Sequence, residues 1–444
     1  MKTRREFLKS WQALGAMGAA GMHLTRLGLI SANAQTTSTY RALVCIFLFG
    51  GNDGNNTIVP LSAAGQSAYQ NARRGIALSA NAVLPIAAGA AAYGLHPRLA
   101  NIQRLYNARK AAAVLNVGTL VRPTVKADLN NGQVPRNLYS HSDQTAQWQT
   151  GNLISGAGTG WAGRVNDLLV ASNAGSFPPG VSVNGNSLLL NGAQTTPVTL
   201  NGNGFGLDGF GDGRANNARV TAYQNLLTFD TGVRLIGAAS GMVTNAVRNA
   251  QTINAALAGA PNLTTVFPGT GLGDQLRQVA QVIQVRAALG MNRQIFFCGM
   301  GGFDNHENLL PEHDRLLGQL DAAIGAFHSA TQEIGVESNV TTFTESEFGR
   351  TMGPSTKAGA DHAWGSNHIV VGGAIRGGEV YGNLPDFTLG GPSDAGDRGL
   401  WIPTLALDQY AATLAQWYGV GAGSLTSVFP NLVNFPTQTI PFLA

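Results

Sequence analysis

Three separate stretches of the chain have the pattern of buried strands that end in glycine and polar residues. The runs Ala42 to Gly51, Ile295 to Cys298 and Val340 to Phe343 are almost continuously hydrophobic. Such runs are typical of parallel strands covered on both faces. In open α/β sheets, ligands bind beyond the carboxyl ends of the strands. We therefore expect the polar residues after these three runs to meet at one edge of a sheet.

Polar and charged residues follow the three runs. They are Asp53 after the first run, Asp304 and His306 after the second, and Glu345, Glu347, Arg350, Asp361, His362 and His368 after the third. All of them except Arg350 have side chains that can bind metals. Imidazole and carboxylate ligands suit zinc, manganese or iron, and an all-oxygen subset suits calcium or magnesium. The pattern predicts a metal site assembled from distant segments.

Helical periodicity marks three further segments. Leu99 to Ala108 has helical spacing and is followed by a strand at Ala111 to Val117, which predicts a βαβ-like unit with a right-handed crossover. Leu309 to Ile334 reads as an amphipathic helix, and Thr404 to Tyr418 as a closing helix. We interpret residues 185–270 as an insertion, or cap, over the sheet.

Two histidines of the amphipathic helix differ in the role that we expect. His313 lies near the start of the helix and faces either the site or solvent. His328 lies deeper in the helix, and we expect it at the surface.

A second helix is predicted to begin among Ser140, His141 and Ser142. Either serine can cap this helix, and a helix N-terminus favours an anion. His141, between the two hydroxyls, is either a functional residue or an ordinary loop histidine.

Arg350 either binds an oxyanion in a bidentate manner or pairs with Glu347.

The first residues have the features of an export signal. Thr3 to Lys9 matches the twin-arginine motif, an Ala/Gly-rich segment follows, and Ala32-Asn33-Ala34 offers a cleavage site. We predict that residues 1–34 are a signal peptide recognised by the twin-arginine translocase, and that the mature protein, residues 35–444, is periplasmic or extracellular. No later segment has about 18 uninterrupted apolar residues, so no membrane span is expected after cleavage.

The charge of the chain gives no reason to expect a nucleic acid partner. The formal net charge of +4 arises from 28 Lys+Arg and 24 Asp+Glu. Residues 1–34 hold five of these bases and one of these acids, which leaves 23 against 23 in the remainder.

The two cysteines, Cys45 and Cys298, lie in two predicted strands. They either form a disulfide, which an oxidising compartment permits, or serve as small buried hydrophobic residues.

Several longer segments resemble the domain-of-unknown-function family 1501. They are FGGNDGNNTIVP (49–60), YSHSDQTAQWQTG (139–151), GWAGR (160–164), GGFDNHENLLPEHDRLL (301–317), SEFGRT (346–351), GADHAWGSNHIVVGGAIRGGEVYG (359–382) and IPTLALDQYAATLAQWYGV (402–420). That family is similar to the alkaline phosphatase and sulfatase superfamily. The resemblance implies a three-layer α/β/α sandwich with a mostly parallel central sheet.

The same resemblance implies two divalent metal ions. It suggests Asp53, Asp361 and His362 around one ion, and Asp304, His306 and His368 around the other. The sequence does not distinguish zinc, manganese and calcium. Arg350 would steady the charge that develops on the transferred group.

The expected nucleophile departs from the superfamily pattern. In phosphatases of the superfamily, a serine or threonine begins a helix that ends in Thr-Gly nine residues later, and counting back from Thr150-Gly151 reaches His141. Ser140 or Ser142 takes the role in a shifted register, or His141 is itself a ligand or nucleophile, or the chemistry is lost.

These observations predict an exported, metal-dependent hydrolase. Its substrate would be a phosphate or sulfate ester of a small molecule or a glycan. The alternative is a non-catalytic periplasmic or surface binding protein that keeps the fold, with or without one structural metal. An exported oxidoreductase is suggested by the export route alone, since the sequence has no motif for a nucleotide cofactor.

Overall fold

The computed structural model describes residues 40–88, 91–132, 134–152, 158–200, 218–219, 221–222, 225 and 234–443. Within these residues, nine strands form one central sheet in the order β11-β5-β10-β9-β1-β8-β6-β7, with β12 paired to β5. Their bounds are Arg41–Leu48 (β1), Ala111–Gly118 (β5), Gly180–Ser182 (β6), Val198–Thr199 (β7), Arg293–Met300 (β8), Val340–Glu345 (β9), Ser366–Gly372 (β10), Val380–Tyr381 (β11) and Leu405–Ala406 (β12). Only β10 among these described strands runs antiparallel to its neighbours. The sheet is therefore mostly parallel, as predicted.

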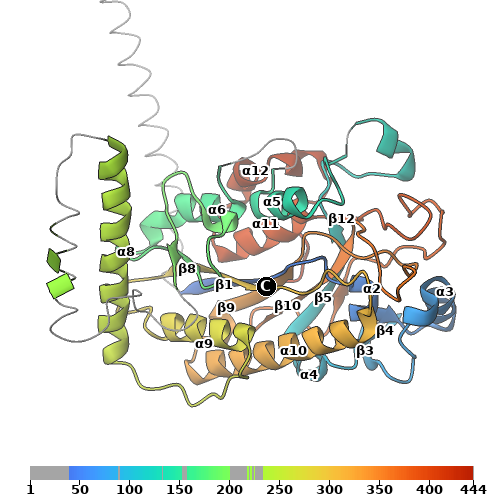
Figure 1. Ribbon diagram of the computed structural model, residues 1–444, viewed down its shortest axis with the longest axis horizontal. Coiled ribbons are helices and arrows are strands. Elements are labelled where there is room, and N and C mark those ends of the chain that lie inside the picture. The colour runs from blue at the N-terminus through green and yellow to red at the C-terminus, as the bar shows by residue number, and fades with distance from the viewer. Residues whose placement is uncertain are drawn as a thin grey trace, which may run out of the picture.

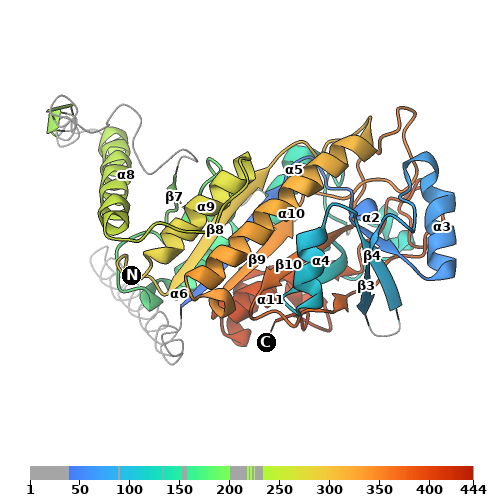
Figure 2. The same cartoon turned by 90° about the horizontal axis from the view of Figure 1, so that it is seen from below.

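Helices cover both faces of this sheet and complete three layers (Figure 1). One face carries α4 (Ala100–Asn107), α9 (Gly271–Gln284) and α10 (Leu309–Glu333), which Figure 2 shows in front of the sheet. The other face carries α5 (His141–Thr150), α6 (Trp161–Leu169), α11 (Leu407–Tyr418) and α12 (Leu425–Val428). The three-layer α/β/α architecture is confirmed.

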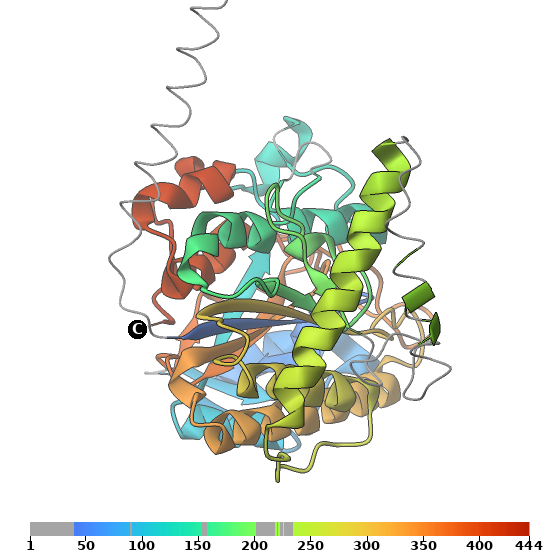
Figure 3. The same cartoon turned by 90° about the vertical axis from the view of Figure 1, so that its left-hand side faces the viewer.

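Smaller elements surround the three layers. Helices α2 (Gly54–Thr57) and α3 (Ala63–Arg73) accompany a second sheet of β2 (Ile58–Pro60), β4 (Ala91–Leu95) and β3 (Leu84–Ala88). Helix α8 (Arg234–Ala258) stands beside one edge of the body (Figure 3). The 3-10 helices are Arg74–Ile76, Lys126–Asn130, Val170–Ser172, Leu188–Leu190, Glu337–Asn339, Ala422–Ser424 and Pro430–Asn434.

The strand β1 divides its side chains between two hydrophobic cores. Val44 and Ile46 join the core under α9 and α10, whereas Leu43 and Cys45 join the core under α6 and α11. This alternation follows from the period of two in a strand. Cys298 of the adjacent β8 lies in the first of these cores, on the other face of the sheet from Cys45. Both cysteines are free and buried, so the interpretation as small hydrophobic residues is confirmed.

Two expectations about the arrangement change. Strand β5 is parallel in direction to β1 but is not its neighbour, because β9 and β10 lie between them. Within the range 185–270, which stays a predicted cap, β7 joins the edge of the central sheet. His328 is buried beside Glu337, so the expected surface position is wrong.

Residues 1–34, the predicted signal peptide, lie outside the described residues. Among the helices that the structure describes, none combines the length and apolarity that a membrane crossing requires.

Candidate metal centre

The carboxyl ends of the central parallel strands meet the start of helix α5. β1 is followed by Gly50, β8 by Asp304, and β9 by Glu347, while His141 is the first residue of α5. Gly50 has a φ of +116°, and a Cβ there would lie 2.4 Å from the backbone nitrogen of Asp304. Glycine is therefore required for these two segments to approach each other. The expectation that polar residues after the three apolar runs converge at one edge is confirmed.

Three donors at this edge form a compact group. Ligand atoms of His141, Asp304 and His362 all lie within 4.8 Å of one another. His141 Nε2 is 3.5 Å from Asp304 Oδ2, and His362 Nε2 is 3.2 Å from Asp304 Oδ1. His306 lies beside the group, with its Nε2 3.0 Å from both Asp304 Oδ1 and His362 Nε2. Three imidazoles thus surround one carboxylate.

The other ring nitrogen of each histidine faces an oxygen acceptor. His141 Nδ1 lies 2.8 Å from Glu347 Oε1, and His306 Nδ1 lies 3.0 Å from Asp361 Oδ1. His362 Nδ1 lies 2.8 Å from the backbone oxygen of Tyr139. A carbonyl or carboxylate oxygen accepts hydrogen bonds, so we assign the proton of each neutral ring to Nδ1.

This assignment leaves the Nε2 lone pairs directed toward Asp304. Lone pairs on neighbouring imidazoles repel one another and the carboxylate unless a cation lies between them. A proton on His306 or a metal ion would supply that positive charge. Metal-binding histidines almost always donate their second ring N–H to a carboxylate or a carbonyl, and all three histidines here have such a partner. The donor set therefore fits a divalent metal ion.

The charges around the group favour this protonation pattern. Burial acts to raise the pKa of Asp304, but the hydrogen bond and charge of Arg350 outweigh it and hold that pKa at about 2. Burial lowers the pKa of His362, which favours its neutral, metal-binding form. Asp304 is therefore ionised, and His362 neutral, near pH 7.

Arg350 has different partners from those expected. Its side chain is fully buried and donates to Asp304 Oδ1 at 2.5 Å and to the backbone oxygens of Gly50, Gly51 and Ala360. The expected contact with Glu347 is replaced by these bonds because the guanidinium lies beneath the turn after β1. Arg350 holds Asp304 in place, and its guanidinium is fully buried rather than exposed to a substrate oxyanion.

Asp361 lies at the rim of the site. It accepts from Arg398 Nη1 at 2.5 Å and contacts His306. Burial acts to raise the pKa of Asp361, but the hydrogen bonds and charges of Arg398 and His306 together outweigh it and lower that pKa below its ordinary value. Asp361 is thus an ionised partner of His306 and supports that ring.

Two residues expected as ligands lie elsewhere. Asp53 is 1% exposed and forms an ion pair with buried Arg73, which neutralises its charge. His368 lies within β10 under α5, where its ring packs against Trp148 and Tyr410. Burial lowers the pKa of His368 to about 3. The structure does not bring either residue into the group around Asp304.

The two serines at the start of α5 have different positions. Ser140 caps the helix by accepting from Asp143 N, and its hydroxyl donates to Asp143 Oδ2 at 2.5 Å. Ser142 is exposed and lines a pocket next to His141. Ordinary capping therefore accounts for Ser140.

His313 is fully buried and lies 3.0 Å from Asn52 Oδ1, so it faces the turn after β1 rather than solvent.

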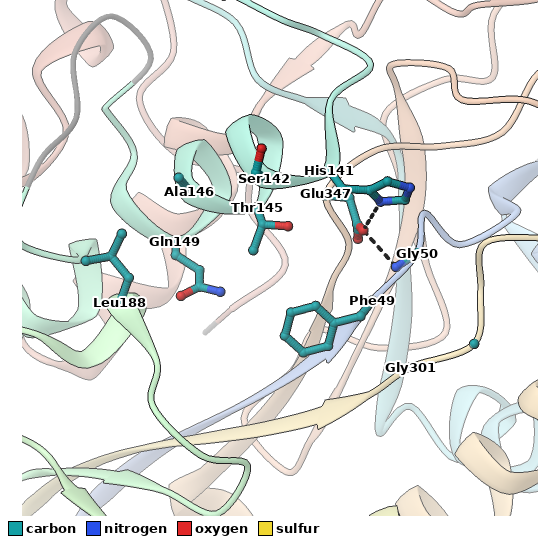
Figure 4. Close-up of a pocket in the computed structure, with 11 residues that line it drawn as sticks. Phe49, Gly50, His141, Ser142, Thr145, Ala146, Gln149, Leu188, Gly301 and Glu347 are labelled. Carbon is teal, nitrogen blue, oxygen red and sulfur yellow. Dashed lines mark hydrogen bonds and ion pairs between the residues drawn. The ribbon is translucent and has the colours of Figure 1, made fainter.

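An open pocket of about 490 Å³ adjoins the group. One wall is the face of α5 that carries His141, Thr145 and Gln149, and Phe49 lies opposite (Figure 4). Glu347 links the turn after β1 to the start of α5, because it accepts from Gly50 N at 2.7 Å and contacts His141. Figure 4 shows both contacts as dashed lines.

Sequence reasoning missed several partners of the site. The sequence pattern offers Glu347 as a possible metal ligand or a partner for Arg350, not as a partner for His141. It gives no indication of Arg73, Arg398 or the Tyr139 carbonyl. Glu347 lies in the apolar-to-polar transition after β9, which is a usable signal. Arg73 and Arg398 lie in segments without a distinctive pattern.

Fold and donors together define an α/β/α protein with a candidate metal centre at the carboxyl ends of its parallel strands. The chain belongs to the family described as "Protein of unknown function (DUF1501)", whose model matches residues 40–392. No curated protein matches the sequence.

Solved structures that are similar to the chain include sulfatases and alkaline phosphatase-like proteins. The PsFucS1 sulfatase from Pseudoalteromonas sp. is 11% identical with a TM-score of 0.36, over 90% of this chain and 71% of that one. The phosphonate monoester hydrolase of Silicibacter pomeroyi is 9% identical with a TM-score of 0.37, over 85% and 73%. The TAB5 alkaline phosphatase is 9% identical with a TM-score of 0.31, over 79% and 95%. At this distance, function has to be argued from the site itself.

Proposed function

We propose that the protein is a metal-dependent hydrolase of phosphate or sulfate esters. The observation that carries the proposal is the convergence of three Nε2 atoms on the Asp304 carboxylate, each ring held through Nδ1 by an oxygen acceptor. A nitrogen-rich donor set of this kind suits a transition metal such as zinc better than calcium or magnesium.

We propose one ion, held by His141, Asp304 and His362. A second ion, as in the two-metal arrangement expected from the sequence, would need Asp53. The carboxylate of Asp53 already pairs with Arg73, so a guanidinium supplies the positive charge there.

The residues of the site divide the chemistry among them. When bound, the ion would act as a Lewis acid toward an ester oxygen and lower the pKa of water. Glu347 orients His141, and Arg350 orients Asp304. His306, with Asp361 behind it, is placed to move a proton to or from the reacting group. Ser142 is the serine that still faces the pocket, and we propose it as the nucleophile.

We further propose that the protein works outside the cytoplasm after export by the twin-arginine translocase. The Thr3 to Lys9 motif and the Ala32-Asn33-Ala34 cleavage site support this proposal.

The test compares the mature protein with the variant Asp304→Asn and the control Asp314→Asn. Asp314 is a carboxylate on the surface of α10 that pairs with Arg98. Hydrolysis of 4-nitrophenyl phosphate and 4-nitrophenyl sulfate is measured with zinc and with manganese. We expect turnover of at least one ester, lost in Asp304→Asn and kept in Asp314→Asn. Equal turnover in both variants would contradict the proposed site.

One observation favours the alternative of a non-catalytic binding protein. The Arg350 guanidinium is fully buried and bonded to Asp304 and to backbone oxygens, so it is not exposed to the oxyanion of a substrate. Metal binding by the wild-type protein without turnover of either ester would support this second function.

A further inference from the structure

The pocket beside His141 has a polar wall and an aromatic wall. Ser142, Thr145 and Gln149 recur at spacings of three and four residues along α5, so they share one face of the helix. The ring of Phe49 lies across the pocket from them (Figure 4). The floor includes Gly301 and Gly302, which leave room because they have no side chains.

Gln149 is held so that its amide nitrogen faces the pocket. It is 5% exposed. Its Oε1 accepts from Leu189 N at 3.1 Å and from Ser187 Oγ at 3.4 Å. A backbone N–H can only donate, so Oε1 must point toward Leu189 and Nε2 must point away from it. Figure 4 shows the amide nitrogen on the side of the pocket that faces Phe49. The result is a fixed hydrogen-bond donor aimed into open space.

The charges at the pocket argue against an anionic group there. Among the described residues, those that line it include no lysine or arginine, and Glu347 contributes a buried carboxylate. A carboxylate or sulfate in this pocket would find no cation to offset the loss of its hydration.

We propose that this pocket binds a neutral sugar ring, the part of the ester substrate that is not transferred. A pyranose has an apolar C–H face, which would pack against Phe49, and hydroxyl groups at its rim, which would meet Gln149, Thr145 and Ser142. A phenol ring would pack on Phe49 but would offer the polar wall a single hydroxyl, whereas a pyranose offers several. This inference rests on the proposed function for its location, and it adds the substrate class.

The test measures sugar binding directly, without requiring hydrolysis. Saturation-transfer NMR is recorded on the mature protein with methyl β-D-galactopyranoside and methyl β-D-glucopyranoside as neutral probes. Sodium glucuronate serves as the anionic probe, and phenol as the aromatic probe. Titrations are repeated with the variants Gln149→Glu and Phe49→Leu.

Gln149→Glu is a sharp variant because one carboxylate oxygen can still accept from Leu189 N, while the donor facing the pocket is replaced by a negatively charged acceptor. Gln194→Glu makes the same chemical change on an exposed loop and serves as the control. Thermal unfolding of each variant identifies any that fails to fold, and Phe49→Leu provides the second route in that case.

We expect at least one neutral glycoside to bind more tightly than glucuronate and phenol. Its affinity should fall about tenfold in Gln149→Glu and should be unchanged in Gln194→Glu. Binding of phenol alone, stronger binding of glucuronate, or equal affinity in both glutamate variants would overturn the proposal.

The same titrations on protein dialysed against a chelator measure sugar binding without a bound metal. Together with the turnover assay, they separate the sugar-subsite proposal from the hydrolase proposal. Sugar binding that depends on Gln149 in a protein that never turns over an ester leaves the subsite standing and the hydrolase proposal wrong. Turnover that depends on Asp304, without sugar binding that depends on Gln149, removes the subsite alone.

Discussion

The carboxylate of Glu347 gives the sharpest test of how the site is held. It is 2% exposed, and one of its oxygens accepts from both Gly50 N, at 2.7 Å, and His141 Nδ1, at 2.8 Å. These bonds fix the His141 ring so that its Nε2 faces Asp304. A residue that acts in this way should control metal affinity without touching the metal.

The expected magnitude follows from the bonds that each variant keeps. In Glu347→Gln, the amide oxygen can still accept both bonds but carries no charge, so we expect about a tenfold loss of metal affinity. Glu347→Ala removes both acceptors, and we expect a loss of about 100-fold, the upper part of the range for partners of metal-binding histidines. The alanine variant also leaves a buried backbone N–H unsatisfied, which costs about 1 to 3 kcal/mol of stability.

Competition between the protein and a chromophoric zinc chelator measures the affinity, and chemical unfolding measures the stability. Glu345→Gln is the matched control, because Glu345 is a buried carboxylate two residues away whose partner is Cys45 in the core under α6 and α11. We expect zinc affinity within twofold of wild type for this control. An alanine variant at Glu347 that is less stable but binds zinc as wild type does would refute the positioning role.

Four further predictions concern stability and the choice of nucleophile. Burial raises the pKa of Glu345 to about 8, so the folded protein keeps a proton that the unfolded chain loses above about pH 4.5. Stability should therefore fall as the pH rises through that window. In the wild type, the loss of stability from Glu345 is on the order of 4 kcal/mol by pH 9, and Glu345→Gln should remove it. A urea midpoint that changes equally between pH 5 and pH 9 in the two proteins would contradict this. Arg73→Met should destabilise the protein by about 3 to 5 kcal/mol, because it leaves the Asp53 carboxylate buried and unpaired. The exposed neighbour Arg74→Met is the control, with chemical unfolding as the measurement. Ser140→Ala should cost about 1 kcal/mol of stability through the lost helix cap and leave metal affinity unchanged. Ser142→Ala should abolish ester turnover without loss of stability, and full turnover in this variant would exclude Ser142 as the nucleophile.

The strands and long helices were predictable because their patterns are local. The apolar runs at β1, β8 and β9 and the periodicity of α10 identify each element without knowledge of its neighbours. The convergence of their carboxyl ends followed from the general geometry of parallel sheets.

The partners within the site were not predictable in the same way. His141 and Glu347 are 206 residues apart, and nothing in either segment indicates the contact. His368 is expected as a metal ligand after the third apolar run. It lies within the strand Ser366–Gly372, whose register directs it into the core under α5. The face of the sheet on which a side chain lies depends on the register of its strand. A small shift in register moves the side chain to the opposite face.

Asp53 shows a different reason for failure. An aspartate after a buried strand can serve equally well as a metal ligand or as one half of a buried ion pair. The choice between them depends on Arg73, which reaches it from α3. No feature of the sequence near Arg73 indicates that contact.

The measurement that tests the central claim most directly is the metal content of the purified mature protein, by elemental mass spectrometry, for the wild type and His362→Ala. We expect about one transition-metal ion per chain in the wild type and a large loss in the variant. Wild-type protein without bound metal, or the same metal content in both proteins, would contradict the assignment of His141, Asp304 and His362 as a metal centre.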